Sequence, residues 1–420
     1  MKKNIKNSSH SFRIWNRNFK VLTIATICGS AGAIAAGYAL SFLVFYETES
    51  VFLSALVLIG RLLPAFVLPL FAGVLLDRFS RCRILVTSDA LNGILYLILG
   101  IWLWIGEFSY TAYLLYSLLL GCASCLDELA YDAVAPMTMT PGGEQKSYAI
   151  SAMIYPTLNV IMMPAAGLIM NTVGIPVLLL TQGFLSLLAA LLDAQIHVVQ
   201  KKSEKKGHSG FEQWKADIVE AYGYLKNEPG LMSMFVYSAM SNALAQAFSP
   251  SLIAFFSITP GFNALMYSFF SVAECLGRMA GSMKQYLVQL PAKRCYSFSI
   301  FALATYNLMD GLLLFCPYPL MLANRFLVGG LGATTYSIRA AAIQTCIPDQ
   351  LRGRINSFQS ILIYLMTGIM VFIFGLLGDL LSPSWLMVVS GLVGMVCLYL
   401  TWGTHRSSCQ KVFLNGNPLC

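Results

Sequence analysis

Residues 73–85 read GVLLDRFSRCRIL and place Asp77, Arg78, Arg81 and Arg83 between two long apolar segments. About twenty mostly apolar residues precede this stretch and about twenty follow it, which is the length of a helix that crosses a bilayer. The charged stretch is too short to be a domain. It is therefore a loop that joins two segments of the same kind.

The composition of the whole chain is that of a membrane protein. Of its 420 residues, 57% are hydrophobic and 11% are charged, and the mean hydropathy is +0.69. A soluble protein of this length would carry roughly 25% charged residues. We therefore predict an all-α integral membrane protein whose main partner is the lipid bilayer.

Apolar segments long enough to span the bilayer recur twelve times along the chain. They are residues 20–45, 51–76, 84–106, 109–135, 148–170, 174–196, 231–256, 262–286, 295–316, 318–343, 356–380 and 383–403. We expect an N-terminal six-helix bundle over 1–196, a cytoplasmic linker over 197–230 and a C-terminal six-helix bundle over 231–420.

The positive charges predict the orientation, because Lys and Arg favour cytoplasmic loops. With both termini in the cytoplasm, every Lys and Arg lies in an inner loop or tail, or inside a segment, whereas outer loops carry acids such as Glu47 and Glu107. We therefore predict a multi-pass protein of the cell membrane, bacterial inner or plasma membrane, without a cleavable signal peptide. The net charge of +8 then reflects topology and anionic lipid, and we expect no nucleic-acid partner.

The residue types that catalysis requires do not form a recognisable set. The sequence has no metal-ligand cluster, no nucleophile–base arrangement and no Gly-x-x-x-x-Gly-Lys run for ATP. Its eleven Cys show no paired spacing, and we interpret them as free thiols, with Cys82 and Cys409 as the reactive candidates. We expect no enzyme activity, no metal and no cofactor, so that a proton gradient supplies the energy.

The two halves of the chain repeat each other. The fourth segment reads LLYSLLLGCASC over 114–125 and the tenth reads LANRFLVGGLGA over 322–333, which aligns Gly121 with Gly329 and Ser117 with Arg325. Six helices, a polar connection and six more helices are the layout of transporters built from two parallel repeats.

The loop GVLLDRFSRCRIL resembles the signature between helices two and three of the major facilitator superfamily. The tracts IPDQLRGRINS (347–357) and FEQWKADIVEAYGYLKNEPGL (211–231) resemble the macrolide-type and siderophore (enterobactin) exporters of that superfamily. The resemblance covers essentially the whole chain. It implies the major facilitator fold of two pseudo-symmetric bundles, and it favours efflux. The second-half copy of the signature has Gln285 where the repeat would place Asp.

The loop residues are candidates for a conformational latch. Gly73 lets two helices approach closely. Asp77 lies at the end of its own helix, where the helix dipole disfavours an anion, so it needs another partner. That partner is an Arg of the loop or the N-terminus of a helix in the other half, and the resemblance implies helix eleven. Arg78, Arg81 and Arg83 also hold the loop at the anionic inner surface, and the alternative is that these charges only anchor the topology.

The fourth segment carries the acids that we consider first for proton coupling. Asp127, Glu128 and Asp132 lie in its inner half, and Glu128 and Asp132 share a helix face. Desolvation and mutual repulsion favour the protonated form of at least one of them. Arg339 in the tenth segment is a candidate charge partner across the cavity. The alternative is a stable salt bridge between the halves.

Other charges also fall within membrane-spanning segments, where ionisable groups are costly and are often functional. Glu274 is a further proton-coupling candidate, and it is four residues from Arg278, so the two can pair on one helix face. Arg61 and Arg325 are additional cavity charges. Three acids lie near segment ends, where we expect them at the membrane surface: Asp193, Asp310 and Asp379.

Polar side chains form a stripe at spacings of three and four residues along the seventh segment. In the major facilitator architecture, helices one, four, seven and ten line the cavity, so we expect this stripe to face the substrate. The substrate-cavity candidates are Tyr38, Tyr131, Ser238, Asn242, Gln246 and Tyr336. In the fifth segment, Pro164 and Gly167 belong to the bend that antiporters of the superfamily show, and Met163 replaces the first Gly. Residues 211–228 are expected to form an amphipathic helix at the inner interface.

These patterns together favour a monomeric secondary active transporter that exports a small amphipathic compound such as a drug, an antibiotic or a siderophore, driven by protons. One alternative is a nutrient importer or facilitator. Another is a transporter-shaped receptor without flux. Either direction of transport, and either proton or sodium coupling, is compatible with these patterns.

Overall fold

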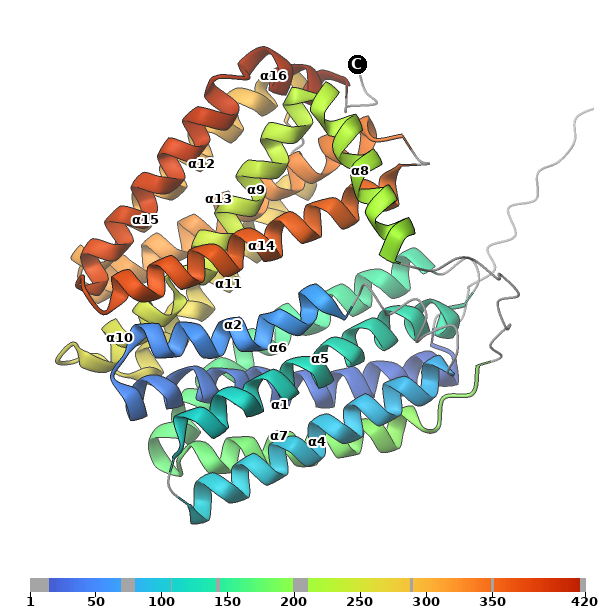
Figure 1. Ribbon diagram of the computed structural model, residues 1–420, viewed down its shortest axis with the longest axis vertical. Coiled ribbons are helices and arrows are strands. Elements are labelled where there is room, and N and C mark those ends of the chain that lie inside the picture. Colours follow the sequence, from blue (N-terminus) through green and yellow to red (C-terminus); the bar gives the residue numbers. More distant parts are fainter. Residues whose placement is uncertain are drawn as a thin grey trace, which may run out of the picture.

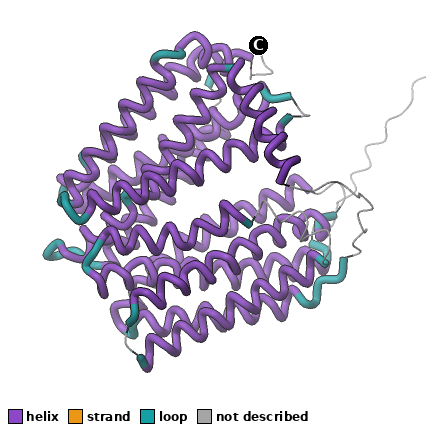
Figure 2. Tube along the Cα trace, in the orientation of Figure 1, coloured by secondary structure: helices purple, strands orange, loops and turns teal. Residues whose placement is uncertain are grey.

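Figure 1 shows the computed structural model, which describes residues 15–68, 80–106, 108–140, 144–198, 211–287, 290–348 and 351–415. Within these ranges the elements are all helices, joined mostly by short loops (Figure 2). Each of the twelve predicted spanning segments corresponds to a helix or to a pair of consecutive helices. The prediction of an all-α membrane fold is therefore confirmed.

Six helices form the first half of the molecule, drawn from blue to green in Figure 1. They are α1 (Arg17–Thr48), α2 (Val51–Val67), α4 (Arg81–Ile105), α5 (Tyr110–Thr138), α6 (Glu144–Thr172) and α7 (Ile175–Asp193). Asn16 caps α1 by accepting from the Phe19 amide at 2.7 Å, and Ser50 caps α2 by accepting from the Leu53 amide at 3.1 Å. These caps satisfy amides that a helix start otherwise leaves unbonded.

The second half repeats this arrangement with one helix divided. It contains α9 (Pro229–Ala247), α10 (Ser249–Ile258), α11 (Ala264–Leu287), α12 (Ala292–Gly311), α13 (Tyr318–Cys346), α14 (Arg352–Gly378) and α15 (Pro383–Leu398). The short turns η1 (Leu313–Phe315) and η2 (Tyr399–Gly403) follow α12 and α15. The predicted segment 231–256 is divided at Phe248, because Pro250 near the start of α10 has no amide hydrogen to continue the preceding helix.

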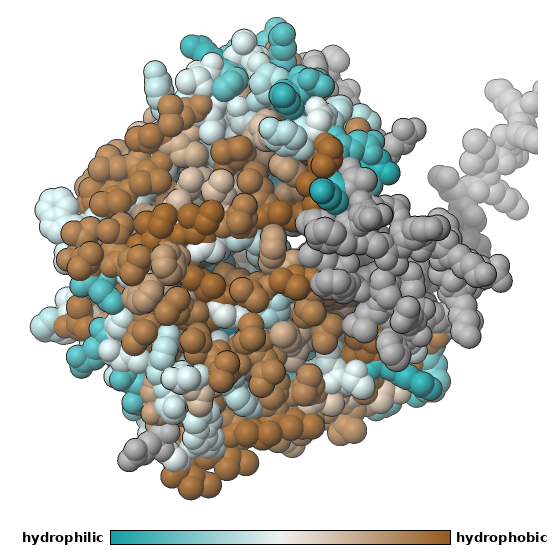
Figure 3. All heavy atoms as spheres, viewed as in Figure 1, coloured by the Kyte–Doolittle hydropathy of each residue, from teal (hydrophilic) through white to brown (hydrophobic). Residues whose placement is uncertain are grey.

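The outer surface of the bundles is that of a protein in lipid. Within the described ranges, eight helices are long and apolar enough to cross a bilayer, and α2 is a shorter apolar helix. Large apolar side chains such as Leu115, Leu191 and Phe301 are 62%, 68% and 69% exposed. Figure 3 shows apolar side chains over the sides of both halves, with hydrophilic ones gathered near α8 and α16. Exposure on this scale is costly in water and favourable against lipid tails.

Two helices outside the spanning set pack on the second half. The predicted amphipathic helix is α8 (Phe211–Asn227), and its Ala221 and Leu225 are fully buried, so this helix packs on the protein. Arg354 of α14 holds α8 through ion pairs to Asp217 at 2.9 Å and Glu220 at 2.5 Å. The second of these helices, α16 (Arg406–Asn415), is the last element that the structure describes.

Cys409 of α16 is buried against the second half, which contradicts its prediction as a reactive thiol. Its side chain lies in a cluster with Trp402 and Phe413 and is 0% exposed. Burial raises the pKa of the Cys409 thiol to about 11. Because the thiolate is the reactive form, this cysteine is inert in the folded protein. Cys82, the other candidate, is partly exposed at the start of α4.

The two halves meet at the end of the molecule where α2 begins. Asp379, after α14, accepts from the Val51 amide at 2.7 Å and from the Ser50 hydroxyl at 2.8 Å, so it caps a helix of the opposite half. The Tyr38 hydroxyl donates to the Ala264 carbonyl across the same junction. From this end the halves separate toward the end where α8 lies (Figure 1).

The aligned glycines of the sequence repeat occupy equivalent packing positions. A Cβ on Gly121 of α5 would collide with the backbone carbonyl of Arg61 in α2, and one on Gly329 of α13 would collide with that of Glu274 in α11. In each half, therefore, the fourth and second helices cross with their backbones in contact at the aligned glycine. Small residues at such crossings are what close helix packing in membranes requires.

Candidate transport cavity

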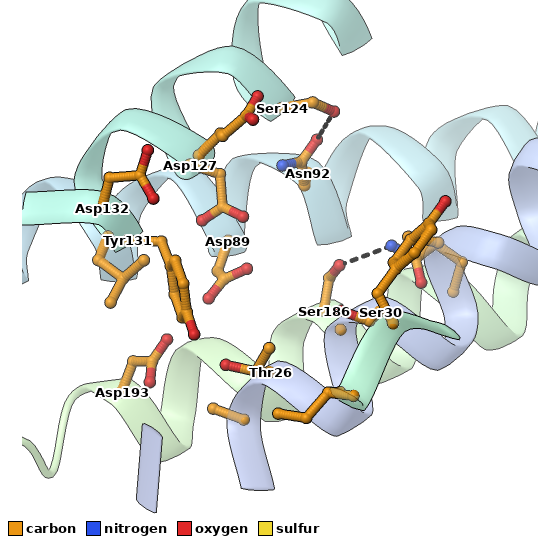
Figure 4. Close-up of a pocket in the computed structure, with 18 of the residues that line it drawn as sticks. Thr26, Ser30, Asp89, Asn92, Ser124, Asp127, Tyr131, Asp132, Ser186 and Asp193 are labelled. Carbon is orange, nitrogen blue, oxygen red and sulfur yellow. Dashed lines mark hydrogen bonds between the residues drawn. The ribbon is translucent and has the colours of Figure 1, made fainter. Parts of the chain in front are cut away.

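A cavity of about 480 Å³ lies in the first half and is lined by residues of α1, α2, α4, α5, α6 and α7. Figure 4 shows the side chains that line it. Five of them are acids, contributed by α4, α5 and α7, and Arg61 is the one cation among the described lining residues. This excess of carboxyl groups is the feature that sets its chemistry.

Three of the acids approach one another from three different helices. Asp89 of α4, Asp127 of α5 and Asp193 of α7 point into the same space (Figure 4). Asp89 and Asp193 are only 8% and 3% exposed. The Ser88 hydroxyl donates to Asp127 Oδ1 at 3.1 Å. We refer to Asp89, Asp127 and Asp193 as the aspartate cluster.

The other two acids lie on α5 beside this cluster. Glu128 and Asp132 are exposed and one helical turn apart, so they share a face, as predicted from their spacing. Tyr131 lies between them in the sequence and also lines the cavity. The structure thus brings together the three predicted acids of the fourth segment with one predicted aromatic residue.

Sequence reasoning missed Asp89 and misplaced Asp193. Asp193 is the last residue of α7 and was expected at the membrane surface, but it is buried among neighbouring helices. Asp89 belongs to the polar set Ser88, Asp89 and Asn92 within an otherwise apolar helix. Polar residues three and four positions apart in an apolar segment also mark the stripe of the seventh segment, and the same pattern is sufficient to identify Asp89.

A second buried charge cluster lies in the other half. Arg325 of α13 is 3.1 Å from Asp310 Oδ1 of α12 and 3.7 Å from Glu274 Oε2 of α11. Its guanidinium also lies over the Phe270 ring, 4.6 Å from the centroid. Asp310 is therefore buried rather than interfacial. Glu274 bonds across helices to Arg325, whereas Arg278, its suggested partner, is exposed on α11.

The remaining cavity charges have no acid partner among the described residues. Arg61 is partly buried and lines both the cavity and a smaller pocket between the halves that includes Ser249 and Pro250. Arg339 is 8% exposed within α13, and it forms no salt bridge to the described acids of α5. Its suggested pairing across the molecule is therefore absent in this conformation.

The predicted polar stripe of the seventh segment does not line this cavity. Ser238 is buried and donates to the Met234 carbonyl, while Asn242 and Gln246 are exposed on α9. Among the tyrosines, Tyr38 is buried at the junction of the halves and Tyr336 is 63% exposed. Their roles as cavity residues stay predictions.

The structure locates part of the latch and the predicted bend. Gly73, Asp77 and Arg78 lie outside the described residues, whereas Arg81 and Arg83 begin α4, partly buried and exposed respectively. The α6 helix continues through Pro164, and the position of a Cβ on Gly167 lies 3.2 Å from the Leu265 Cα of α11. Gly167 therefore permits close contact between the two halves.

A comparison with known protein families matches residues 22–309 to the family described as "Major Facilitator Superfamily". The chain belongs to this superfamily. It is thus a multi-pass membrane protein of the secondary transporter type, and its family indicates a transporter rather than an enzyme. No curated protein matches the sequence.

Solved structures share the fold at low sequence identity. The nucleoside transporter NupG (D323A mutant) has a TM-score of 0.68 at 12% identity, with 93% of this chain and 98% of that chain covered. A bacterial homologue of the iron transporter ferroportin, in an inward-facing state, has 0.68 at 14% identity, covering 95% and 98%. The POT family transporter PepTSo has 0.65 at 13% identity, covering 94% and 98%.

Proposed function

We propose that this protein is a proton-driven exporter of a small amphipathic compound, acting as a monomer by alternating access in the cell membrane. The observation that carries the proposal is the aspartate cluster, with Glu128 and Asp132 beside it, in a cavity where Arg61 is the one cation among the described lining residues. The sequence resemblance to macrolide-type and siderophore exporters favours efflux as the direction.

The cluster has the chemistry that proton exchange needs. Carboxylates that face one another with little exposure repel when all are ionised, so the cluster is stabilised by holding a proton or a cationic ligand. Asp89 and Asp193, both nearly buried, contribute most to this requirement. A substrate that enters can displace the proton, and a proton that enters can displace the substrate. Exchange of this kind couples the two fluxes.

The contacts between the halves supply a route for alternating access. In this conformation the halves are joined where Asp379 caps α2 and where Tyr38 reaches Ala264, and they separate toward α8. We assign the α8 end to the cytoplasm, as the distribution of Lys and Arg predicts. Closure of the α8 end then requires new contacts there, for which Gly73, Asp77 and the loop arginines are the proposed latch.

The proposal is tested in inside-out membrane vesicles that contain the protein and are energised to an acidic interior. A pH-sensitive dye reports the gradient while a panel of amphipathic compounds is added. We expect particular compounds to collapse the gradient with the wild type, and expect Asp127→Asn and Glu128→Gln to abolish that response. Glu47→Gln, which removes an exposed acid at the opposite end, is the matched control and should respond like the wild type.

Each alternative has its own outcome in this assay. Transport of a labelled compound that persists without any gradient indicates a facilitator or importer. A response that survives in both acid variants removes the role proposed for these carboxylates. If every compound acts no more strongly than it does on vesicles without the protein, the exporter proposal gives way to a receptor without flux.

A further inference from the structure

We infer that the cavity of the first half binds an organic cation that carries N–H donors, such as a primary amine or a guanidinium. The inference names the substrate class of the proposed transporter, and it rests on that function only in treating this cavity as the transport site. Its main support is a buried acceptor atom to which the described residues direct no permanent donor.

That atom is Oδ1 of Asp193. The Asp193 side chain is 3% exposed and lines the cavity. Its carboxyl group meets that of Asp89, with which it can share one proton, and no permanent donor among the described residues is directed at its Oδ1. A buried acceptor without a donor is costly, more so when it is charged. In Figure 4 this carboxyl group points toward the space that Asp89 and Tyr131 also face. A ligand donor at this position removes the cost.

A neighbouring amide also has an acceptor atom without a donor. The Gln182 side chain directs its amide nitrogen to the Ser186 hydroxyl oxygen at 3.0 Å, and its carbonyl oxygen is unpaired and lies against Gly32 of α1. Asn92 Oδ1 accepts from the Ser124 hydroxyl at 3.5 Å. The rest of the polar wall is mostly hydroxyl groups, which can accept as well as donate, so a ligand with several N–H donors finds acceptors beyond the carboxylates.

The charge of the wall determines the sign of the ligand. Five carboxyl groups line the cavity and Arg61 is the single described cation, so an anionic ligand would be repelled. A neutral ligand would leave protons alone to compensate the carboxylates. Among the described residues, no group of three or more His, Cys, Asp or Glu side chains is arranged so that it could hold a metal ion. An organic cation compensates the negative charge of the carboxylates and does not require the ligand geometry of a metal ion.

The rest of the cavity suits the apolar body of such a ligand. Tyr96, Tyr131 and Tyr155 line it, and aromatic faces attract cations and pack against apolar groups. A volume of about 480 Å³ lies within the usual range for small-molecule sites. An amphipathic amine can thus place its nitrogen at the aspartate cluster and its apolar part among the tyrosines.

Direct binding tests the inference without a proton gradient. We would titrate the purified full-length protein in lipid nanodiscs with three matched probes by calorimetry: phenethylamine, trimethylphenethylammonium and phenethyl alcohol. They share one apolar body and differ in charge and in N–H donors. We expect the amine to bind, the quaternary ammonium to bind about tenfold or more weakly, and the alcohol to show no measurable binding, since charge-assisted hydrogen bonds contribute that much.

Variants identify the atoms involved. Asp193→Asn and Asp89→Asn should each weaken amine binding about tenfold or more, because each removes a carboxylate charge. Glu47→Gln should leave it unchanged. Thermal unfolding of each variant checks the fold, and if Asp193→Asn fails to fold, Asp89→Asn carries the test. Equal binding of the amine and the alcohol, or amine binding that neither variant weakens, overturns the inference.

The outcomes separate this inference from the proposed function. If the amine binds as expected but no compound collapses the gradient in vesicles, the site stands and proton-driven export fails. If a neutral compound collapses the gradient and the amine does not bind, export stands and the cation site fails.

Discussion

The buried guanidinium of Arg325 allows a quantitative test of how the second half is held together. Its side chain and that of Asp310 are 3% and 7% exposed and 3.1 Å apart, while Glu274, at 3.7 Å, is 35% exposed. Replacing Arg325 with Leu removes the cation that both acids share. Asp310 then remains buried without a counter-charge.

The expected cost follows from this geometry. Removing one partner of a buried ion pair typically costs about 3–5 kcal/mol of unfolding free energy. Asp310→Leu should cost less, about 1–3 kcal/mol, because Arg325 retains Glu274 as a partner. Replacing both residues with Leu leaves neither charge buried alone, and such apolar replacements are often neutral, within about 1 kcal/mol of the wild type. The order of stability is therefore wild type and double variant, then Asp310→Leu, then Arg325→Leu.

The assay is reversible unfolding in mixed micelles of mild detergent and sodium dodecyl sulfate, followed by circular dichroism and fluorescence. Arg278→Leu is the matched control, because it removes an exposed Arg from the neighbouring helix and should change stability by no more than about 0.5 kcal/mol. If Arg325→Leu costs no more than Arg278→Leu, or if the double variant is as unstable as the two single changes added together, the reasoning is wrong.

Two further predictions concern the junction and the tail. Asp379→Ala removes one of the two side chains that cap α2, worth about 1 kcal/mol, and leaves the Ser50 cap in place, so hydrogen exchange at the Val51 amide should accelerate. Asp379→Asn retains an acceptor oxygen and should exchange more slowly than Asp379→Ala. Equal rates in all three proteins would contradict the capping role. At pH 8, a thiol with a pKa of about 11 is about a hundredfold less ionised than an ordinary cysteine, so Cys409 should resist maleimide in the folded protein and react once the protein is unfolded. Mass spectrometry of the labelled peptides measures this difference. Rapid labelling of Cys409 in the folded state would place α16 away from the core.

Much of the fold follows from the sequence alone. Apolar runs of the right length located all twelve segments, and the Gly121–Gly329 alignment identified positions where helix backbones touch in both halves. The break at Phe248 was missed, although Pro250 marks it. An apolar run long enough to span the bilayer was read as one helix, and the missing amide hydrogen of one proline was not weighed against it.

The acids that line the candidate cavity were predicted only in part. Asp127, Glu128 and Asp132 were found because charged residues within an apolar segment are conspicuous. Asp193 was misassigned because a residue at a helix end faces the membrane surface or a neighbouring helix depending on how the bundle packs. Glu274 could pair with Arg278 by spacing, yet the actual partner, Arg325, lies on another helix.

The sequence by itself determined that the chain lies in a bilayer, the number and order of its spanning segments, and the family to which it belongs. These depend on the lengths of apolar runs and on short local motifs, which are properties of consecutive residues. Only the tertiary structure brought Asp89, Asp127 and Asp193 together and gave Arg325 its two acids. In lipid, apolar side chains cover the outside of a helix as well as its inside, so hydrophobic periodicity does not reveal which face turns inward, and only the packing of helices decides which polar groups meet.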